Sequence, residues 1–180
     1  MKKSLTLFLL LTSFTLLFAQ AKNKNLKINY DFISVDLNGN EISSEIYSRN
    51  TITMINIWGT FCGPCIREMP DLAKLSEANK DKGVEIIGIP IDVSDATGRL
   101  LPRAKKSADS IIAQTGVTYK NVVPNHQMLS GFLRDVIAVP TSIFIDKNGN
   151  QIGEIYMGSR SQKDWQLIID KLLKSQSQLN

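Results

Sequence analysis

Apolar residues along this chain form short continuous runs in some segments and helical stripes in others. Residues 51–58 and 84–91 are rich in β-branched and apolar side chains, a pattern typical of strands buried on both faces. Residues 64–80 lie between these runs and place apolar side chains on one helix face: Ile66, Met69, Leu72, Leu75 and Ala78. The pattern therefore predicts a strand, a helix and a second strand, in that order.

Two Asn-Gly pairs mark predicted turns. Residues 32–37 alternate by side-chain type before the pair at 38–39, and residues 141–145 and 152–157 flank the pair at 148–149. Asn-Gly supplies the two residues with positive φ that a tight hairpin turn requires. We therefore predict one short hairpin before the first buried strand and a second hairpin in the C-terminal part of the chain.

The stretch from 95 to 136 departs from this alternation. Its first helical stripe consists of Leu101, Ala104, Ala108, Ile111 and Ile112. A short strand is predicted over 117–123, and a second helical stripe consists of Met128, Leu129, Phe132, Leu133 and Val136. An amphipathic helix over 165–173 ends the pattern. Parallel strands joined by helices, with an antiparallel hairpin at the end, predict a mixed α/β sheet in one domain over 31–175, followed by a polar tail at 176–180.

The segment at 1–21 has the pattern of a secretory signal peptide. Two lysines follow Met1, an apolar stretch continues to Phe18, and Ala-Gln-Ala at 19–21 gives the small-x-small pattern of a cleavage site. An uncleaved membrane anchor is the competing interpretation, although the uncharged run barely reaches the ~20 residues that a span needs. In both cases we expect the protein to work outside the cytoplasm, periplasmic or secreted, with a polar lead-in at 22–30.

Composition excludes several classes of protein. Hydrophobic residues make up 43% of the chain and charged residues 21%, which is close to globular averages and excludes wholesale disorder. A formal net charge of +4 over 180 residues is modest, so nucleic acid is not expected as a partner. Two cysteines are too few for a disulfide-stapled small scaffold or an all-cysteine zinc site.

Both cysteines lie in one C-x-x-C motif, Cys62 and Cys65, directly after the first predicted strand. Cys62 is expected at a helix N-terminus, where unpaired backbone N–H groups and the helix dipole favour a thiolate. Pro64 suits the first helical turn, where its missing N–H has no cost. A first thiol of lowered pKa with a second thiol one turn away forms an attacking and resolving pair, so the motif indicates thiol–disulfide redox chemistry.

Two alternative interpretations of the motif are weaker. A purely structural disulfide would close a loop of four residues and would stabilise the fold by only about 2 kcal/mol. A metal site would take two ligands from the motif, and the one histidine, His126, is far away in the sequence. We therefore predict a redox disulfide, no metal site and no cofactor.

The chain resembles the TlpA/ResA-like branch of the thioredoxin superfamily. The resemblance rests on residues 58–70, on Val139-Pro140-Thr141 and on the secretory signal, and it covers residues 31–173. It implies a thioredoxin-like fold with a central mixed β-sheet flanked by helices, an N-terminal hairpin extension and an internal insertion. The stretch from 95 to 136 fits that insertion.

The resemblance also implies roles for individual residues. Cys62 would be the nucleophile and Cys65 the resolving thiol. Pro140 would be a cis-proline facing the disulfide, and Val139 would offer backbone hydrogen bonds to a bound peptide. Glu68 would move protons on and off Cys65; from residue types alone it is an ordinary helix glutamate, whereas burial would raise its pKa and suit it to acid–base work.

Four further residues are expected to bind the substrate around the disulfide, together with Val139 and Pro140. Trp58 is predicted to pack beside it, with membership of the plain core an equally good interpretation. Phe61 stands where many relatives carry Trp, which would change the docking surface. Gly63 and Pro64 form the dipeptide of cytoplasmic thioredoxins, which are reductants, and therefore favour a reducing role.

These features together predict an extracytoplasmic thiol–disulfide oxidoreductase that reduces disulfide-bearing partner proteins. No glutathione pool re-reduces such an enzyme outside the cytoplasm, so a membrane thiol-electron donor is implied. Relatives often serve cytochrome c maturation or similar reductive tasks. One alternative is a redoxin-type thiol peroxidase, although the Pro-x-x-x-Thr-x-x-Cys signature of those enzymes does not precede Cys62. The other is a non-catalytic thioredoxin-like module that binds a metal or a partner protein.

Overall fold

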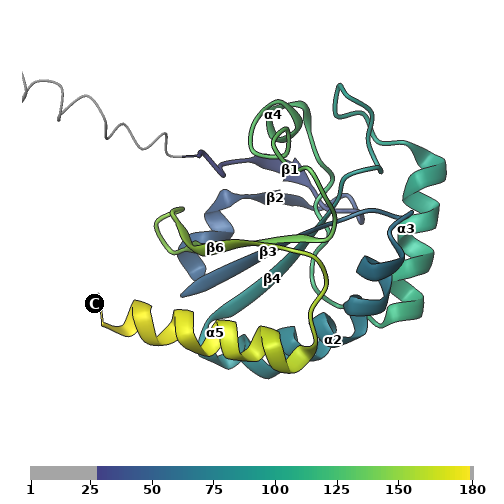
Figure 1. The fold of residues 1–180 in the computed structure, drawn as a ribbon. Helices are drawn as coiled ribbons and strands as arrows, with labels where there is room; N and C mark the ends of the chain where they lie inside the picture. The colour runs from purple at the N-terminus through teal and green to yellow at the C-terminus, as the bar shows by residue number, and fades with distance from the viewer. Residues whose placement is uncertain (1–27, 179–180) are drawn as a thin grey trace, which may run out of the picture.

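A four-stranded sheet forms the centre of residues 28–178, the part of the chain that the computed structural model describes (Figure 1). Its strands lie in the order β4-β3-β5-β6. Their bounds are β3 Ile52–Trp58, β4 Val84–Pro90, β5 Thr141–Asp146 and β6 Gln151–Met157. β4 runs parallel to β3, β5 antiparallel to β3, and β6 antiparallel to β5. The mixed sheet predicted from the sequence is therefore confirmed, whereas the predicted signal peptide lies outside the described residues.

Three long helices accompany the sheet: α2 (Gly63–Asn79), α3 (Pro102–Thr115) and α5 (Gln162–Ser177). α2 and α5 lie side by side on one face, with α3 next to α2 (Figure 1). Their buried side chains form one core cluster with the Ile52, Met54 and Trp58 side of β3. The last helix begins at a Ser161 N-cap and continues to Ser177, into the predicted polar tail.

The opposite face of the sheet is covered by the N-terminal hairpin, which consists of β1 (Ile33–Val35) and β2 (Glu41–Ser43). The 3-10 helix η1 (Ser44–Arg49) links the hairpin to β3, and the short α4 (His126–Ser130) lies on the same side (Figure 1). A second 3-10 turn, η2 (Lys80–Lys82), ends in Gly83 before β4. On the face of the sheet that the hairpin covers, Phe32, Tyr47 and Met128 pack against Ile55 and Ile57 of β3. β3 is thus buried on both faces, as its composition predicts.

The turns differ from the predicted two-residue hairpins. Gly39 (φ 85°) and Gly149 (φ 76°) have positive φ, whereas neither preceding asparagine does. The carboxylate of Asp36 accepts hydrogen bonds from the backbone N–H groups of residues 38 and 40. Asp146 does the same for residues 148 and 150. Each aspartate therefore holds a longer loop in which only the glycine needs the left-handed region.

The insertion is less regular than its apolar pattern predicts. The expected strand over 117–123 makes only isolated bridges, Gly88 to Asn121 and Asp36 to Val122. The second helical stripe ends early, because α4 stops at Ser130 and the chain turns at Gly131. Phe132 and Leu133 are nevertheless buried, although they lie in a loop and not in a helix. Among the described residues, no helix combines the length and apolarity needed to cross a membrane.

Gly88 fixes the irregular segment to the sheet. Its N–H donates to Lys120 O at 2.8 Å, and its carbonyl accepts from Val122 N–H at 2.8 Å. The amide oxygen of Asn121 occupies the space where a Cβ on Gly88 would lie, with only 2.1 Å between the two positions. The same oxygen accepts a hydrogen bond from Trp58 Nε1 at 2.9 Å. The missing side chain of Gly88 therefore allows the insertion to contact the end of β3.

Gly88→Ala should lower the free energy of unfolding by about 1–3 kcal/mol, because the new methyl group displaces Asn121. Urea unfolding followed by tryptophan fluorescence measures the effect. Gly63→Ala is the matched control, since its added Cβ meets only the guanidinium end of the Arg67 side chain, at 3.3 Å. A Gly88→Ala protein as stable as wild type would show that this contact is not required.

Candidate active site

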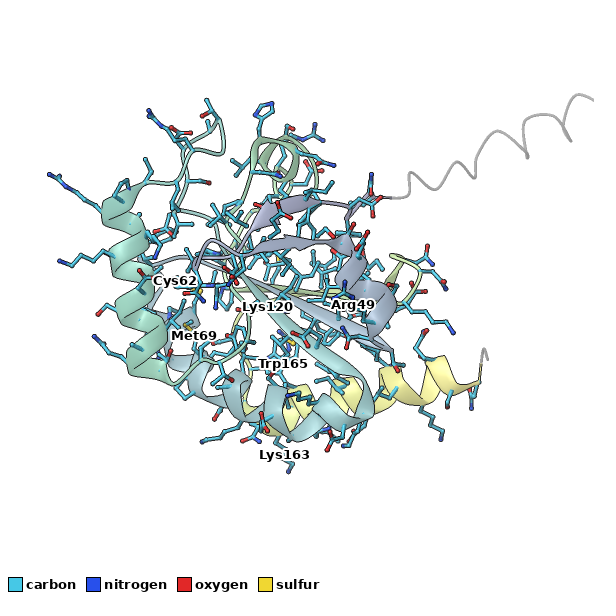
Figure 2. All side chains as sticks on the ribbon, turned by 180° about the vertical axis from the view of Figure 1, so that it is seen from behind. Arg49, Cys62, Met69, Lys120, Lys163 and Trp165 are labelled. Carbon is cyan, nitrogen blue, oxygen red and sulfur yellow. A yellow bond between two sulfur atoms is a disulfide. The ribbon has the colours of Figure 1, made fainter. Side chains whose placement is uncertain are left out.

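The two cysteines lie at the start of α2 and form a disulfide (Figure 2 labels Cys62). Cys62 is the N-cap residue, and its Sγ accepts a hydrogen bond from the backbone N–H of Cys65 at 3.2 Å. Cys62 is 6% exposed and Cys65 is 1% exposed. The helix N-terminus therefore directs a donor at the outer sulfur, where it would stabilise negative charge on the reduced thiol.

The loop before the cysteines is fixed by Asp92, which follows β4. Thr60 N–H donates to both carboxylate oxygens of Asp92, at 3.0 and 3.2 Å, and the Thr60 hydroxyl donates to one of them as well. Trp58 O accepts from Ile91 N–H at 2.9 Å. Asp92 is not among the residues predicted from the sequence. The sequence feature that could have identified Asp92 is a carboxylate just after the buried strand β4, which pairs in parallel with β3, the strand that leads into the motif.

The segment around Pro140 lies next to the disulfide. The Val139–Pro140 peptide bond is cis. The carbonyl oxygen of Val139 is 3.5 Å from Cys62 Sγ, although the two residues are 77 positions apart. Pro140 O accepts a hydrogen bond from Gly158 N–H at 2.8 Å, which ties this segment to the end of β6. The structure thus brings Val139 and Pro140 to the cysteine motif.

The other residues expected at the site divide into surface and core positions. Phe61 is 69% exposed, and Gly63 and Pro64 are also exposed, so all three lie on the surface around Cys62. Trp58 is fully buried and belongs to the same core cluster as both cysteines. Trp58 therefore lies beneath the exposed surface around Cys62. Ile137, which is 87% exposed, lies two residues before Val139 and adds an apolar side chain close to this surface.

Glu68 lies on the inner side of α2, three residues after Cys65, and is only 4% exposed. Its Oε1 accepts hydrogen bonds from Trp165 Nε1 at 2.6 Å and from the backbone N–H of Arg160 at 2.8 Å. Burial raises the pKa of the Glu68 carboxyl, and these two hydrogen bonds offset part of that effect. The residue is therefore a buried carboxylate and not the solvated helix glutamate that its residue type alone suggests.

The partners of Glu68 come from the C-terminal part of the chain and were not predicted. Figure 2 shows Trp165 between α5 and the sheet. The Arg160 guanidinium lies over the rings of Tyr156 and Trp165, 5.1 Å from each ring centroid. It also donates hydrogen bonds to the carbonyl oxygens of Met157 and Gly158. These contacts hold the loop before α5 against the carboxylate.

Solved structures with the same fold are thioredoxin-like. A thiol:disulfide interchange protein of the thioredoxin family from Chlorobium tepidum superimposes with a TM-score of 0.67 at 22% identity, covering 82% of this chain and 96% of that chain. The thioredoxin domain of a thiol-disulfide oxidoreductase from Bacteroides vulgatus gives a TM-score of 0.63 at 20% identity, covering 81% of this chain and 95% of that chain. The fold class is therefore that of thioredoxin, as the sequence predicts.

Sequence comparison narrows this class to a family. The AhpC/TSA family matches residues 19–151. Thiol-disulfide oxidoreductase ResA of Geobacillus kaustophilus is 32% identical over 135 residues, which cover 74% of this chain and 70% of the relative. ResA of Bacillus thuringiensis is 29% identical over 142 residues, covering 79% and 75%. The chain belongs to the AhpC/TSA family, in the TlpA/ResA-like branch of the thioredoxin superfamily, and is a thiol–disulfide oxidoreductase.

Stability should depend on pH through Glu68. The folded protein holds the proton of the Glu68 carboxyl more tightly than the unfolded chain does, because that carboxyl has the ordinary pKa of 4.5 in the unfolded chain. Ionisation therefore penalises the folded state, and the free energy of unfolding should fall as pH rises from 4.5 through the raised pKa, with a slope of up to about 1.4 kcal/mol per pH unit.

Urea unfolding of the oxidised protein at a series of pH values measures this slope. Glu68→Gln should abolish the fall, because glutamine does not ionise. Glu77→Gln, an exposed position on the same helix, should retain it. Equal slopes in wild type and Glu68→Gln would contradict the assignment.

Proposed function

We propose that this protein reduces disulfides in partner proteins outside the cytoplasm, with Cys62 as nucleophile and Cys65 as resolving thiol. The observation that carries the proposal is the position of Cys62 at the N-terminus of α2, with the N–H of Cys65 directed at its sulfur and Val139 O beside it. The hydrogen bond from the Cys65 N–H favours a thiolate on Cys62. The Val139 carbonyl oxygen is a backbone acceptor at the position where an extended partner segment would bind.

The first step joins the two proteins. The Cys62 thiolate attacks one sulfur of the partner disulfide, so that a Cys62–partner disulfide forms and the partner's own S–S bond breaks. The second partner sulfur leaves as a thiolate and takes up a proton. Phe61, Gly63 and Pro64 surround Cys62 on the exposed surface and would contact the partner there.

The second step releases the reduced partner. Glu68, buried one helical turn beyond Cys65, accepts the Cys65 proton, and the Cys65 sulfur then attacks the Cys62 sulfur. The Cys62–partner bond breaks, the Cys62–Cys65 disulfide forms, and the departing partner thiolate recovers the proton from Glu68. Two electrons have then passed from the dithiol to the partner.

The cycle requires a source of electrons. No glutathione pool reduces disulfides outside the cytoplasm, so a membrane thiol-electron donor must return the pair to its dithiol form. The signal-like segment at 1–21 supports the location, and Gly63-Pro64 supports the reducing direction. Cytochrome c maturation is a reductive task of this type.

Cys65→Ser should accumulate a covalent complex with a model disulfide-bearing protein, because the resolving thiol is missing. Non-reducing gel electrophoresis, with release by dithiothreitol, measures the complex. Cys62→Ser should form none. An absence of any complex with Cys65→Ser would contradict the exchange mechanism. Rapid peroxide consumption by wild type but not by Cys62→Ser would favour the thiol peroxidase alternative.

Residues 1–21 should direct the chain out of the cytoplasm. Fusion of this segment to alkaline phosphatase, which becomes active only where its disulfides form, should give an active reporter in a bacterial host. The phosphatase without the segment is the negative control. An inactive fusion, made in full length and retained in the cytoplasm, would contradict the proposed location.

A further inference from the structure

Arg160, in the loop between β6 and α5, is held by contacts on several sides. It is half-buried, and its guanidinium lies 5.1 Å from the ring centroids of both Tyr156 and Trp165. Its Nη1 donates hydrogen bonds back along the loop, to Gly158 O at 2.9 Å and to Met157 O at 3.2 Å. One side chain therefore contacts the end of β6, the loop itself and the start of α5.

The same loop contacts two parts of the candidate active site. At one end, Gly158 N–H donates to Pro140 O at 2.8 Å. At the other end, Arg160 N–H donates to Glu68 Oε1 at 2.8 Å. Gly158 has a positive φ of 83°, which glycine adopts without steric cost. The hydrogen bond to Glu68 therefore depends on the conformation of a short loop, and the contacts of the Arg160 guanidinium hold that conformation.

Two properties of arginine suit it to this position. Its planar guanidinium stacks on aromatic rings and presents several donors in a rigid arrangement, whereas a lysine ammonium is a compact charge on a flexible stem. Its permanent charge also favours the ionised form of a nearby carboxyl. We propose that Arg160 is a positioning residue of the resolving step: it fixes the loop so that its own backbone N–H remains on Glu68, and thereby keeps this carboxylate able to accept the Cys65 proton. The role of Glu68 toward Cys65 rests on the proposed function.

Arg160 takes no proton and forms no covalent bond in this step. The Cys65 S–H bond breaks and a Glu68 O–H bond forms, while the guanidinium stays protonated. The backbone N–H of Arg160 and its charge both lower the pKa of the Glu68 carboxyl. Loss of the arginine side chain should therefore raise the pKa of Glu68 and leave less of the proton acceptor ionised at a given pH.

Three groups on neighbouring elements also act on Glu68 or respond to its charge. Trp165 on α5 donates to Glu68 Oε1, and Asp71 on α2 raises the Glu68 pKa. Tyr119 in the insertion keeps its proton, because burial and the charge of Glu68 both raise its pKa. A substitution at position 160 removes none of these groups, so a shift in the Glu68 titration reports on Arg160 and its loop.

Arg160→Met tests this inference, since it keeps an unbranched side chain and removes the charge and the donors. The carboxyl carbon of Glu68 is titrated by NMR in the oxidised full-length protein with 13C-labelled glutamate, and Glu68→Gln assigns the signal. The titration midpoint should rise by roughly half a unit to one unit in Arg160→Met. Arg160→Lys is a milder second variant that keeps the charge without the planar donors, and it should give a smaller rise in the same direction.

Lys163→Met is the matched control. Lys163 is exposed on α5, three residues beyond Arg160, and Figure 2 shows it on the outer side of the helix. This variant removes the same formal charge and leaves the loop contacts of Arg160 intact, so the Glu68 midpoint should stay in place. An unchanged midpoint in Arg160→Met, or an equal rise in Lys163→Met, would overturn the proposed role of Arg160.

The same variants are then compared in resolution of a Cys62–partner disulfide that is formed at low pH and transferred to a series of higher pH values. The pH midpoint of the rate should move upward with the NMR midpoint in Arg160→Met and stay in place in Lys163→Met. A raised Glu68 midpoint with an unchanged rate profile would support the positioning of the carboxylate by Arg160 and contradict the role of Glu68 in the proposed function, so the two failures are distinguishable.

Discussion

The complete burial of β3 between a parallel and an antiparallel neighbour is the constraint on which the site depends. The register places Trp58 beside Pro90 and Ile57 beside Thr141, so the C-terminal ends of β3 and β4 and the first residue of β5 meet at one edge of the sheet. The segments that follow or precede these ends carry the cysteine motif, Asp92, and Val139-Pro140. Strand pairing therefore brings these segments together although they are distant in the sequence, and it does so independently of the side chains of the site.

Helix α2 then places Cys62 and Glu68 in different environments. Its first turn directs a backbone donor at Cys62, whose negative charge is thereby favoured. One turn further along, the same helix places Glu68 in the core against α5, where burial favours the protonated carboxyl. A charge-stabilising site at the surface and a proton-holding site in the interior are thus separated by less than two helical turns. This arrangement suits a cycle in which one thiol attacks as an anion and the other must first lose a proton.

The sequence predicted those parts that depend on local pattern. The buried runs 51–58 and 84–91 and the helix over 64–80 match β3, β4 and α2 to within about two residues, because double-sided burial and a single helical stripe leave clear periodicities. Both Asn-Gly turns were predicted with the wrong geometry, since the capping carboxylates of Asp36 and Asp146 control them. Asp92 and Trp165 were not assigned to the site, because each reaches it through hydrogen bonds to a residue that is distant in the sequence. The buried environment of Glu68 likewise depends on α5, nearly a hundred residues later.

The central claim is that the Cys62–Cys65 pair is a reductant of protein disulfides. The most direct measurement is the reduction potential of the pair in the purified protein, equilibrated against defined thiol–disulfide buffers. The account predicts a value near that of thioredoxin, about −270 mV, since a reductant must give up electrons readily. A value near about −120 mV would identify a disulfide-forming oxidant and contradict the proposed direction.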